Sequence, residues 1–131
     1  MSEIKLNFAF LCDLAFIGEE GKLCIIGIFK NIKGTTFPLK HPLMYVVTNV
    51  SVANSGHYEE EIRILRIRDK APIVSPVKFD VNISIKNGKH AEIGGMGRIT
   101  DATFNEAGEY EIQVFINNEF ITAIPFSVIA S

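Results

Sequence analysis

The sequence contains no tryptophan and only two cysteines, Cys12 and Cys24. Flat aromatic rings supply the stacking platforms of carbohydrate-binding proteins, so the absence of tryptophan argues against such a platform. Small secreted domains that depend on disulfides carry a denser set of cysteines than this chain does. We therefore expect two free thiols and a reducing, cytoplasmic location.

Long apolar runs and a strong charge of either sign are also missing. No stretch approaches the roughly 18 apolar residues of a membrane-spanning helix, and the first residues lack the basic and then apolar pattern of a secretory signal. The formal net charge is -2, which argues against a basic surface for nucleic acid and against electrostatic attachment to a membrane. We therefore expect neither nucleic acid nor a membrane as a partner.

The chain has enough apolar residues for one stable domain. Of its 131 residues, 47% are hydrophobic, which is typical of globular proteins and too rich for a disordered chain. A domain of this length buries about two thirds of the surface that its unfolded chain exposes, so it needs no disulfide or metal for stability. The sequence has no repeats and no linkers, and we expect a single domain over residues 1–131.

Apolar and polar residues alternate along most of the chain, most clearly in residues 77–85. Successive side chains of a strand point to opposite faces, so this pattern predicts strands with one buried and one wet face. About eight or nine such segments, spaced roughly 8 to 12 residues apart, predict an all-β fold, an antiparallel β-sandwich of the immunoglobulin-like kind. The expected strands are residues 4–12, 22–29, 32–37, 43–53, 59–69, 77–85, 92–104, 110–116 and 120–128.

Three of these segments carry finer expectations. Apolar residues at every second position from Ile4 to Cys12 predict that these side chains share one face. Residues 22–29 are apolar at both odd and even positions (on both parities), and therefore on both faces of a strand, which predicts a central strand covered on both sides. The alternation changes phase between Ile64 and Leu65, which predicts a β-bulge or a twist at that point.

Two short asparagine motifs predict tight turns. Asn87-Gly88 follows the 77–85 strand and is a strong hairpin signal. Asn117-Asn118 separates the last two strands, and asparagine tolerates the left-handed conformation that a tight hairpin needs. If Ile116 pairs with Phe120, the connection is either a loop of odd length or a two-residue turn with a bulge.

The segment Glu106-Ala107-Gly108-Glu109-Tyr110 leads directly into the 110–116 strand. It resembles the tyrosine corner of immunoglobulin-like sandwiches, in which the tyrosine hydroxyl bonds to the backbone a few residues upstream. Ile112 stands where antibody domains have their second cysteine, so no disulfide between the sheets is expected. We interpret Tyr110 as a structural residue rather than a ligand contact.

The histidines do not form a recognisable metal site. His41, His57 and His90 are spread over loops and turns, and no two of them have the spacing of paired metal ligands. The acidic run Glu59-Glu60-Glu61 lies close to His57 and is interpreted as a solvated face, with a cation site as the alternative. We therefore expect no metal and no cofactor.

Two further motifs have weak chemical interpretations. The glycines of Gly94–Arg98 suggest a phosphate cradle, but no helix follows, as a dinucleotide fingerprint requires, so we expect a bulged or closely packed strand. Neither Cys12 nor Cys24 has a histidine nearby in the sequence, and a buried cysteine is usually an inert apolar residue. We expect no catalytic residue and hence no enzyme.

Residues Phe8–Asp13, Gly21–Leu23 and Gly27–Phe29 resemble the opening of a family of short bacterial proteins that is catalogued as a domain of unknown function. The later motifs that fit the same family are Phe37-Pro38, His41-Pro42 and Gly108-Glu109-Tyr110 with the hairpin that follows. The resemblance implies a β-sandwich and a bacterial or phage-related origin. It implies no catalytic residues.

These observations favour a non-catalytic module for protein interaction or structure. The alternative is a small ligand-binding protein or enzyme whose site lies on loops 38–42, 54–58 and 86–91, which hold all three histidines. If those loops meet around an apolar pocket at one end of the domain, the alternative is favoured.

We also expect a homodimer. The segment Leu43–Val47 is apolar on both parities, whereas a small sandwich usually leaves one face of each sheet wet. The alternation places Met44 and Val46 inward and Tyr45 and Val47 outward. The outer face is then covered either by loops or by a second copy of the chain, and symmetric dimers are the commonest oligomers.

Overall fold

The computed structural model describes residues 4–86 and 88–131. Strands dominate this part of the chain, and one short 3₁₀ turn, Glu19–Gly21, accompanies them, so the expected all-β class is confirmed. The strands of the described residues are β1 (Ile4–Ile17), β2 (Leu23–Ile28), β3 (Asn31–Gly34), β4 (Leu39–Val52), β5 (Gly56–Arg66), β6 (Val77–Ile83), β7 (Ala91–Phe104), β8 (Gly108–Ile116) and β9 (Glu119–Ala130).

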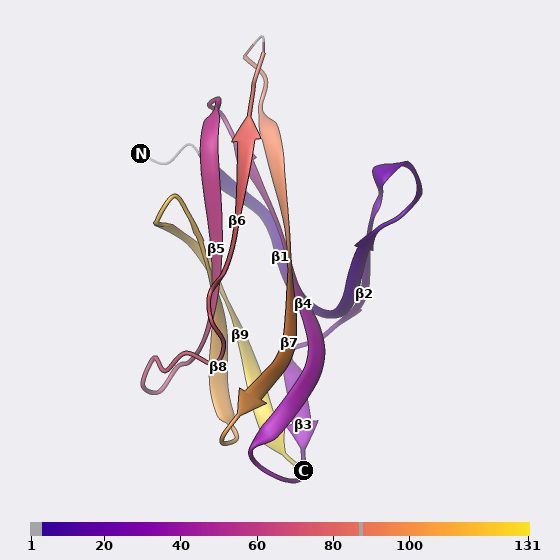
Figure 1. Ribbon diagram of the computed structural model, residues 1–131, viewed down its shortest axis with the longest axis vertical. Helices are drawn as coiled ribbons and strands as arrows, with labels where there is room; N and C mark the ends of the chain where they lie inside the picture. Colours follow the sequence, from indigo (N-terminus) through magenta and orange to yellow (C-terminus); the bar gives the residue numbers. More distant parts are fainter. Residues whose placement is uncertain (1–3, 87) are drawn as a thin grey trace.

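The strands form two sheets (Figure 1). The four-stranded sheet has the order β2-β1-β4-β7, and the five-stranded sheet has the order β3-β9-β8-β5-β6. The ladders between neighbouring strands of the described residues are antiparallel, as expected, except that β3 runs parallel to β9. The five-stranded sheet is curled rather than flat.

The core lies between the two sheets and takes residues from both. At its centre Tyr110 packs edge-on against Phe104, with the ring centroids 5.0 Å apart, and stacks on Phe126 at 5.7 Å. These aromatic rings are surrounded by aliphatic side chains from both sheets, including Met44 of β4 and Ile62 of β5. A second buried cluster lies nearer the end where β4 meets β5 and consists of Val50, Val52, Tyr58, Ile93 and Ile116.

The expectation that residues 22–29 form a covered central strand is wrong. β2 is the edge strand of the four-stranded sheet and pairs only with β1 in the part of the chain that is described. Its apolar side chains therefore lie on an edge that the molecule itself leaves largely open, and Ile28 is 54% exposed. Apolar residues at both odd and even positions of a strand indicate that both of its faces are to be covered. The pattern does not show whether the same chain or another one covers them.

The bulge expected between Ile64 and Leu65 is absent from the ladder of β5 with β8. β5 pairs with β8 without a shift of register, and Leu65 on its outer face is covered by the segment after β5, where Pro72 bridges to it. The break is in β1 instead, where the register against β4 shifts between Leu6 and Phe8. Side chains from Ile4 to Cys12 consequently do not share one face: Leu6 packs in the second core cluster, whereas Cys12 packs on the outer side.

Two other local details follow from backbone chemistry. β4 begins at Leu39, earlier than expected, and runs through Pro42, which has no N–H to donate. The ladder tolerates Pro42 because the opposite residue, Asp101, is itself irregular, with a φ of 55°. Asn117 and Asn118 both have positive φ, and Ile116 pairs with Glu119 rather than with Phe120. The register then shifts between Phe115 and Val114, so the last hairpin is a two-residue turn with a bulge.

The expected turn at Asn87-Gly88 involves Asn87, which lies outside the described residues.

The tyrosine corner is confirmed, and the same device occurs a second time. The Tyr110 hydroxyl donates a 2.7 Å hydrogen bond to the carbonyl of Glu106, four residues upstream. In the same way the Tyr58 hydroxyl donates a 2.6 Å bond to the carbonyl of Asn54. Each tyrosine comes two residues after a glycine with positive φ, Gly108 at 151° and Gly56 at 155°. The shared glycine–x–tyrosine spacing was the signal in the sequence for the second corner.

Candidate functional site

The three histidine-bearing loops do not meet. Residues 38–42 lie at the end of the four-stranded sheet where β4 pairs with the last residues of β7, near Phe104. Residues 54–58 and the described part of 86–91 lie at the opposite end, where Ser55 Oγ accepts a 2.8 Å hydrogen bond from the amide of Ile85. The pocket at one end that a loop-based site requires is therefore not formed by these segments.

The histidines have separate surroundings. His57 is exposed, and hydrogen bonds to Asn82 Oδ1 (2.9 Å) and Asp80 Oδ1 (3.2 Å) raise its pKa. Burial lowers the pKa of His41, whose Nε2 has no hydrogen-bond partner in the residues that the structure describes. In residues 4–86 and 88–131 no group of three or more histidine, cysteine, aspartate or glutamate side chains is placed to hold a metal ion.

The two cysteines are free thiols. Cys12 is fully buried, and burial raises the pKa of its thiol, which disfavours the reactive thiolate. Its Sγ lies 3.6 Å from the carbonyl oxygen of Leu14. Cys24 lies on the edge strand β2 and is partly exposed.

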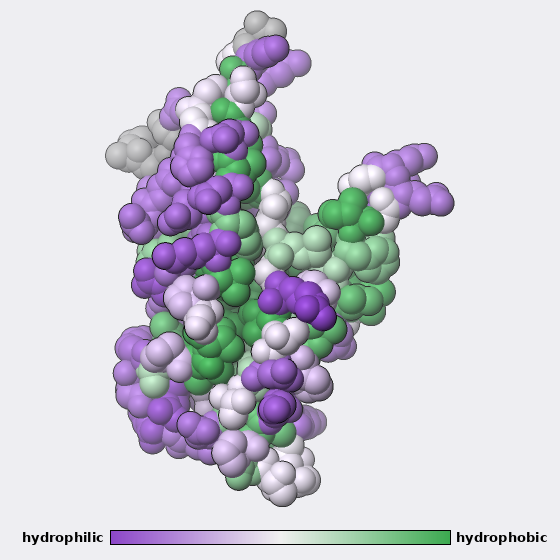
Figure 2. Space-filling model, viewed as in Figure 1, coloured by the Kyte–Doolittle hydropathy of each residue, from purple (hydrophilic) through white to green (hydrophobic). Residues whose placement is uncertain are grey.

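The first candidate surface is an arm formed by the end of β1, the Glu19–Gly21 turn and β2, which we call the hairpin arm (residues 13–28). It diverges from the rest of the molecule in Figure 1, and apolar residues gather on it in Figure 2. Of the eight large hydrophobic side chains that are exposed in the described residues, six belong to the arm. They are Leu14, Phe16, Ile17, Leu23, Ile26 and Ile28.

A kink at the base of the arm decides which of its faces is covered. Gly27 has a φ of 71° and lies directly against the side chain of Asp13, where a Cβ atom would clash. Beyond this kink Ala15 and Ile25 pack with Val47 on the outer face of the four-stranded sheet. The opposite side of the arm, with the paired residues Leu14 and Ile26, has no cover.

This arrangement accounts for the apolar segment Leu43–Val47. Met44 and Val46 face the core and are fully buried, as the alternation predicted. Val47 lies on the outer face but is buried as well, because Ala15 and Cys12 pack against it, and Tyr45 packs onto the same cluster. The hairpin arm therefore covers the outer face of this segment. The apolar surface that stays exposed belongs to the arm.

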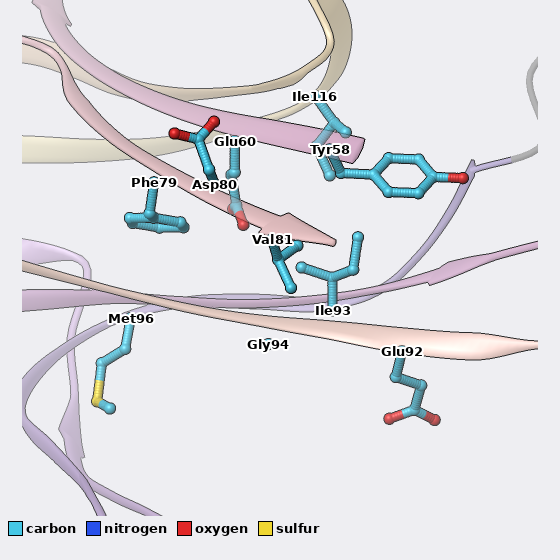
Figure 3. A pocket seen from close by; sticks show the side chains of 10 residues that line it. All are labelled: Tyr58, Glu60, Phe79, Asp80, Val81, Glu92, Ile93, Gly94, Met96 and Ile116. Carbon is cyan, nitrogen blue, oxygen red and sulfur yellow. The ribbon is translucent and has the colours of Figure 1, made fainter. Parts of the chain in front are cut away.

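The second candidate is a cleft of about 450 Å³ between the two sheets, at their open edge. Its lips are β6 and β7, which are the last strands of their respective sheets. Figure 3 shows Phe79, Val81 and Ile93 directed into the space between the lips, whereas the carboxylates of Asp80 and Glu92 point away from it. The walls are therefore apolar and the rim is acidic.

A single carboxyl group, that of Glu60, lies inside this cleft. The residue is only 2% exposed, and its Oε2 accepts a 2.5 Å hydrogen bond from the hydroxyl of Thr48 across the core. Its Oε1 is buried and has no hydrogen-bond partner among residues 4–86 and 88–131. Burial raises the pKa of Glu60, and the bond from Thr48 opposes that shift only in part.

Glycine in β7 makes room for this carboxyl group. A Cβ atom on Gly95 would lie 2.5 Å from both Glu60 Oε1 and Thr48 Oγ1. A Cβ on Gly97 would lie 3.1 Å from Ile62 Cδ1, which is also tight. The interpretation of Gly94–Arg98 as a closely packed strand is confirmed. The glycines do not interrupt the strand, because β7 pairs with β4 continuously through this segment.

The interpretation of Glu59-Glu60-Glu61 as a solvated face is wrong for two of the three residues. Glu60 and Glu61 are both buried, and Glu61 pairs with Arg63 and, at 4.0 Å, with Lys78. The signal for Glu60 was its position, because it shares the parity of Tyr58 and Ile62 on β5 and these face the core. A charged residue on the apolar parity of a strand indicates a buried group that needs a partner.

Comparison with known proteins supports the family suggested by the sequence motifs. Residues 7–129 match the model of a family of unknown function, DUF6941. The chain belongs to this family. No curated protein matches it.

One similar solved structure is the Pseudomonas fluorescens alkylpurine DNA glycosylase AlkC bound to DNA containing an abasic site analogue, with a TM-score of 0.50 and 12% identity. The match covers 98% of this chain but only 31% of the glycosylase chain. At this identity the likeness concerns the fold alone. No helix in the described residues is long and apolar enough to cross a membrane.

The raised pKa of Glu60 predicts a pH dependence of stability. The folded protein keeps the proton over a pH range, above the usual value of 4.5, in which the unfolded chain releases it. The stability that Glu60 contributes is therefore fully present below the unfolded pKa and is lost as the pH rises through the folded pKa. Thr48, which bonds to Glu60, does not titrate, and the other titratable residues along the cleft are Tyr58 and, at the rim, Asp80 and Glu92.

The test is urea denaturation of wild type and Glu60→Gln at a series of pH values. Gln keeps the shape and accepts the bond from Thr48 but cannot ionise, so the variant should gain on wild type as the pH rises from about 5 to about 8, by at most about 1.4 kcal/mol per pH unit. A constant difference between the two proteins over this range would show that Glu60 does not titrate abnormally.

Proposed function

We propose that this protein is a non-catalytic interaction module and that its hairpin arm binds the arm of a second copy of the same chain. The observation that carries the proposal is the concentration of exposed apolar side chains on the arm. Contiguous apolar surface of this kind on a soluble domain marks an interaction site more often than a free surface. The expected homodimer is kept, but its surface is the arm and not Leu43–Val47.

The edge of β2 supports strand pairing as the mode of contact. An exposed edge presents unpaired backbone N–H and C=O groups, and proteins usually protect such edges with charged residues, proline or a bulge. Between Leu23 and Ile28 the strand has no charged residue and no proline. Apart from the kink at Gly27, β2 is therefore an unprotected edge with apolar side chains on both of its faces.

Charge favours a second copy over an unrelated strand. Two β2 strands in antiparallel register about an axis at Ile25, with Ile25 opposite Ile25 of the other copy, form a self-complementary contact, as a two-fold dimer requires. That register directs the acidic turn of one arm, at Glu19 and Glu20, toward Lys30 of the other copy. The net charge of -2 adds little long-range repulsion.

Sedimentation tests this proposal. At about 100 μM, which populates even a complex with a Kd near 10 μM, wild type should sediment at twice the chain mass of 14.6 kDa. Ile26→Lys places a charge on each side of the two-fold axis and should leave only monomer, since like charges at an interface cost several kcal/mol. A wild-type monomer at this concentration would end the proposal.

Phe120→Lys is the matched control. Phe120 is 54% exposed and Ile26 is 51% exposed, but Phe120 lies on β9, away from the arm. The Phe120→Lys protein should therefore remain a dimer. Equal dissociation of both variants would mean that added charge, rather than the arm, decides the outcome.

We further propose that the two sheets form an immunoglobulin-like sandwich and that the protein works in the bacterial cytoplasm. The Tyr110 corner supports the first point, because this hydroxyl-to-backbone bond is characteristic of that architecture. The two free cysteines support a reducing compartment.

A further inference from the structure

We propose that the cleft between β6 and β7 is a binding site for small amphipathic amines, with the ammonium group of the ligand on Glu60 and its apolar body between the two sheets. Its volume of about 450 Å³ is within the roughly 300 to 1,000 Å³ of small-molecule pockets. This site is separate from the hairpin arm and does not depend on self-association.

The unpartnered oxygen of Glu60 defines the polar end of the ligand. Thr48 donates a hydrogen bond to Oε2, whereas Oε1 is buried and has no partner within the described part of the chain. A buried polar atom in this state is costly, so a hydrogen-bond donor that reaches it is strongly favoured. An ammonium group supplies both a donor and the charge that lets the carboxyl group ionise.

The charge of the lining selects a cation over a neutral or anionic group. None of the ten residues that line the cleft is basic, and three of them are acidic: Glu60, Asp80 and Glu92. Asp80 and Glu92 lie at the rim and raise the local concentration of cations. An anionic ligand would meet repulsion from Asp80 and Glu92 at the rim.

Apolar side chains define the rest of the ligand. Phe79, Val81 and Ile93 enter the cleft from its two lips, and Ile116 lies among the side chains deeper in it (Figure 3). The lips belong to different sheets and share no ladder, so they can separate without breaking a strand pair. A compact apolar or aromatic group can therefore enter from the edge and be buried beside the carboxyl group.

Calorimetric titration with 2-phenylethylamine, which is protonated at neutral pH, tests the site. Wild type should bind one molecule with a Kd at or below about 1 mM. The isosteric anion 3-phenylpropanoate should not bind, and methylammonium, which has no apolar body, should bind at least about tenfold more weakly. Absence of saturable binding of 2-phenylethylamine would overturn the proposal.

Two variants of equal charge separate the site from general electrostatics. Glu60→Gln should weaken binding at least about tenfold, because a charge-assisted hydrogen bond is lost. Glu59→Gln removes the same charge from the neighbouring position of β5, on the other parity, and should bind as wild type does. Equal loss in both variants, or no loss in Glu60→Gln, would contradict the assignment.

A measurement on the unaltered cleft covers the case in which Glu60→Gln does not fold. Bound ammonium requires ionised Glu60, so the affinity should rise as the pH increases from about 5 to about 8, while the amine stays protonated. The pKa of His57 is raised as well, but this residue of β5 is exposed and bonds to Asp80 on the outer side of β6, so His57→Gln should show the same rise. An affinity that does not change with pH would overturn the role of Glu60.

Discussion

Replacing Tyr110 with alanine should lower the free energy of unfolding by about 3 to 5 kcal/mol, the usual range for a large aromatic side chain in a core. Tyr110 is fully buried between Phe104 and Phe126 and anchors both rings. The truncation removes these contacts, leaves a cavity that the sheets cannot close, and breaks the corner bond to Glu106. Urea denaturation followed by circular dichroism measures the loss.

A conservative variant separates the corner from the packing. Tyr110→Phe keeps the ring and removes only the hydroxyl, so the carbonyl of Glu106 loses its donor, at an expected cost of about 1 to 3 kcal/mol. Tyr58→Phe removes the equivalent 2.6 Å bond to Asn54 and should have a similar effect. If Tyr110→Phe unfolds at the same urea concentration as wild type, the hydroxyl does not contribute to stability.

Replacing Gly95 with alanine should destabilise the protein by about 1 to 3 kcal/mol, as overpacking of a filled core does. The new methyl group would lie 2.5 Å from Glu60 Oε1 and from Thr48 Oγ1, so the carboxyl group must move and its bond to Thr48 is strained or lost.

Gly94→Ala is the matched control for this substitution. Gly94 is the preceding residue of the same strand, on the opposite face, and a Cβ there meets nothing within 4 Å. Its effect on the free energy of unfolding should be close to zero or slightly stabilising, because alanine lowers the entropy of the unfolded chain. Similar destabilisation by both variants would mean that glycine is needed for the backbone of β7 and not for space around Glu60.

The alternation of apolar and polar residues determined the strands, because side-chain direction in a strand is a local property of the backbone. The Tyr110 corner was predictable for the same reason, since its hydroxyl and its acceptor are only four residues apart. The turn at Asn117-Asn118 likewise depends on the left-handed conformations of two adjacent residues. Each of these features requires no knowledge of distant segments.

Only the tertiary structure decided the two candidate sites. That β2 is an edge strand follows from which strands pair across the whole chain, and its apolar residues alone do not distinguish a covered centre from an open edge. Glu60 is a buried carboxyl group with a hydrogen bond to only one of its two oxygens because β5 lies opposite Thr48 and Gly95, which belong to the other sheet. The alternation along β5 indicates that Glu60 faces the core, but the groups that meet it there, and hence its pKa, depend on long-range packing.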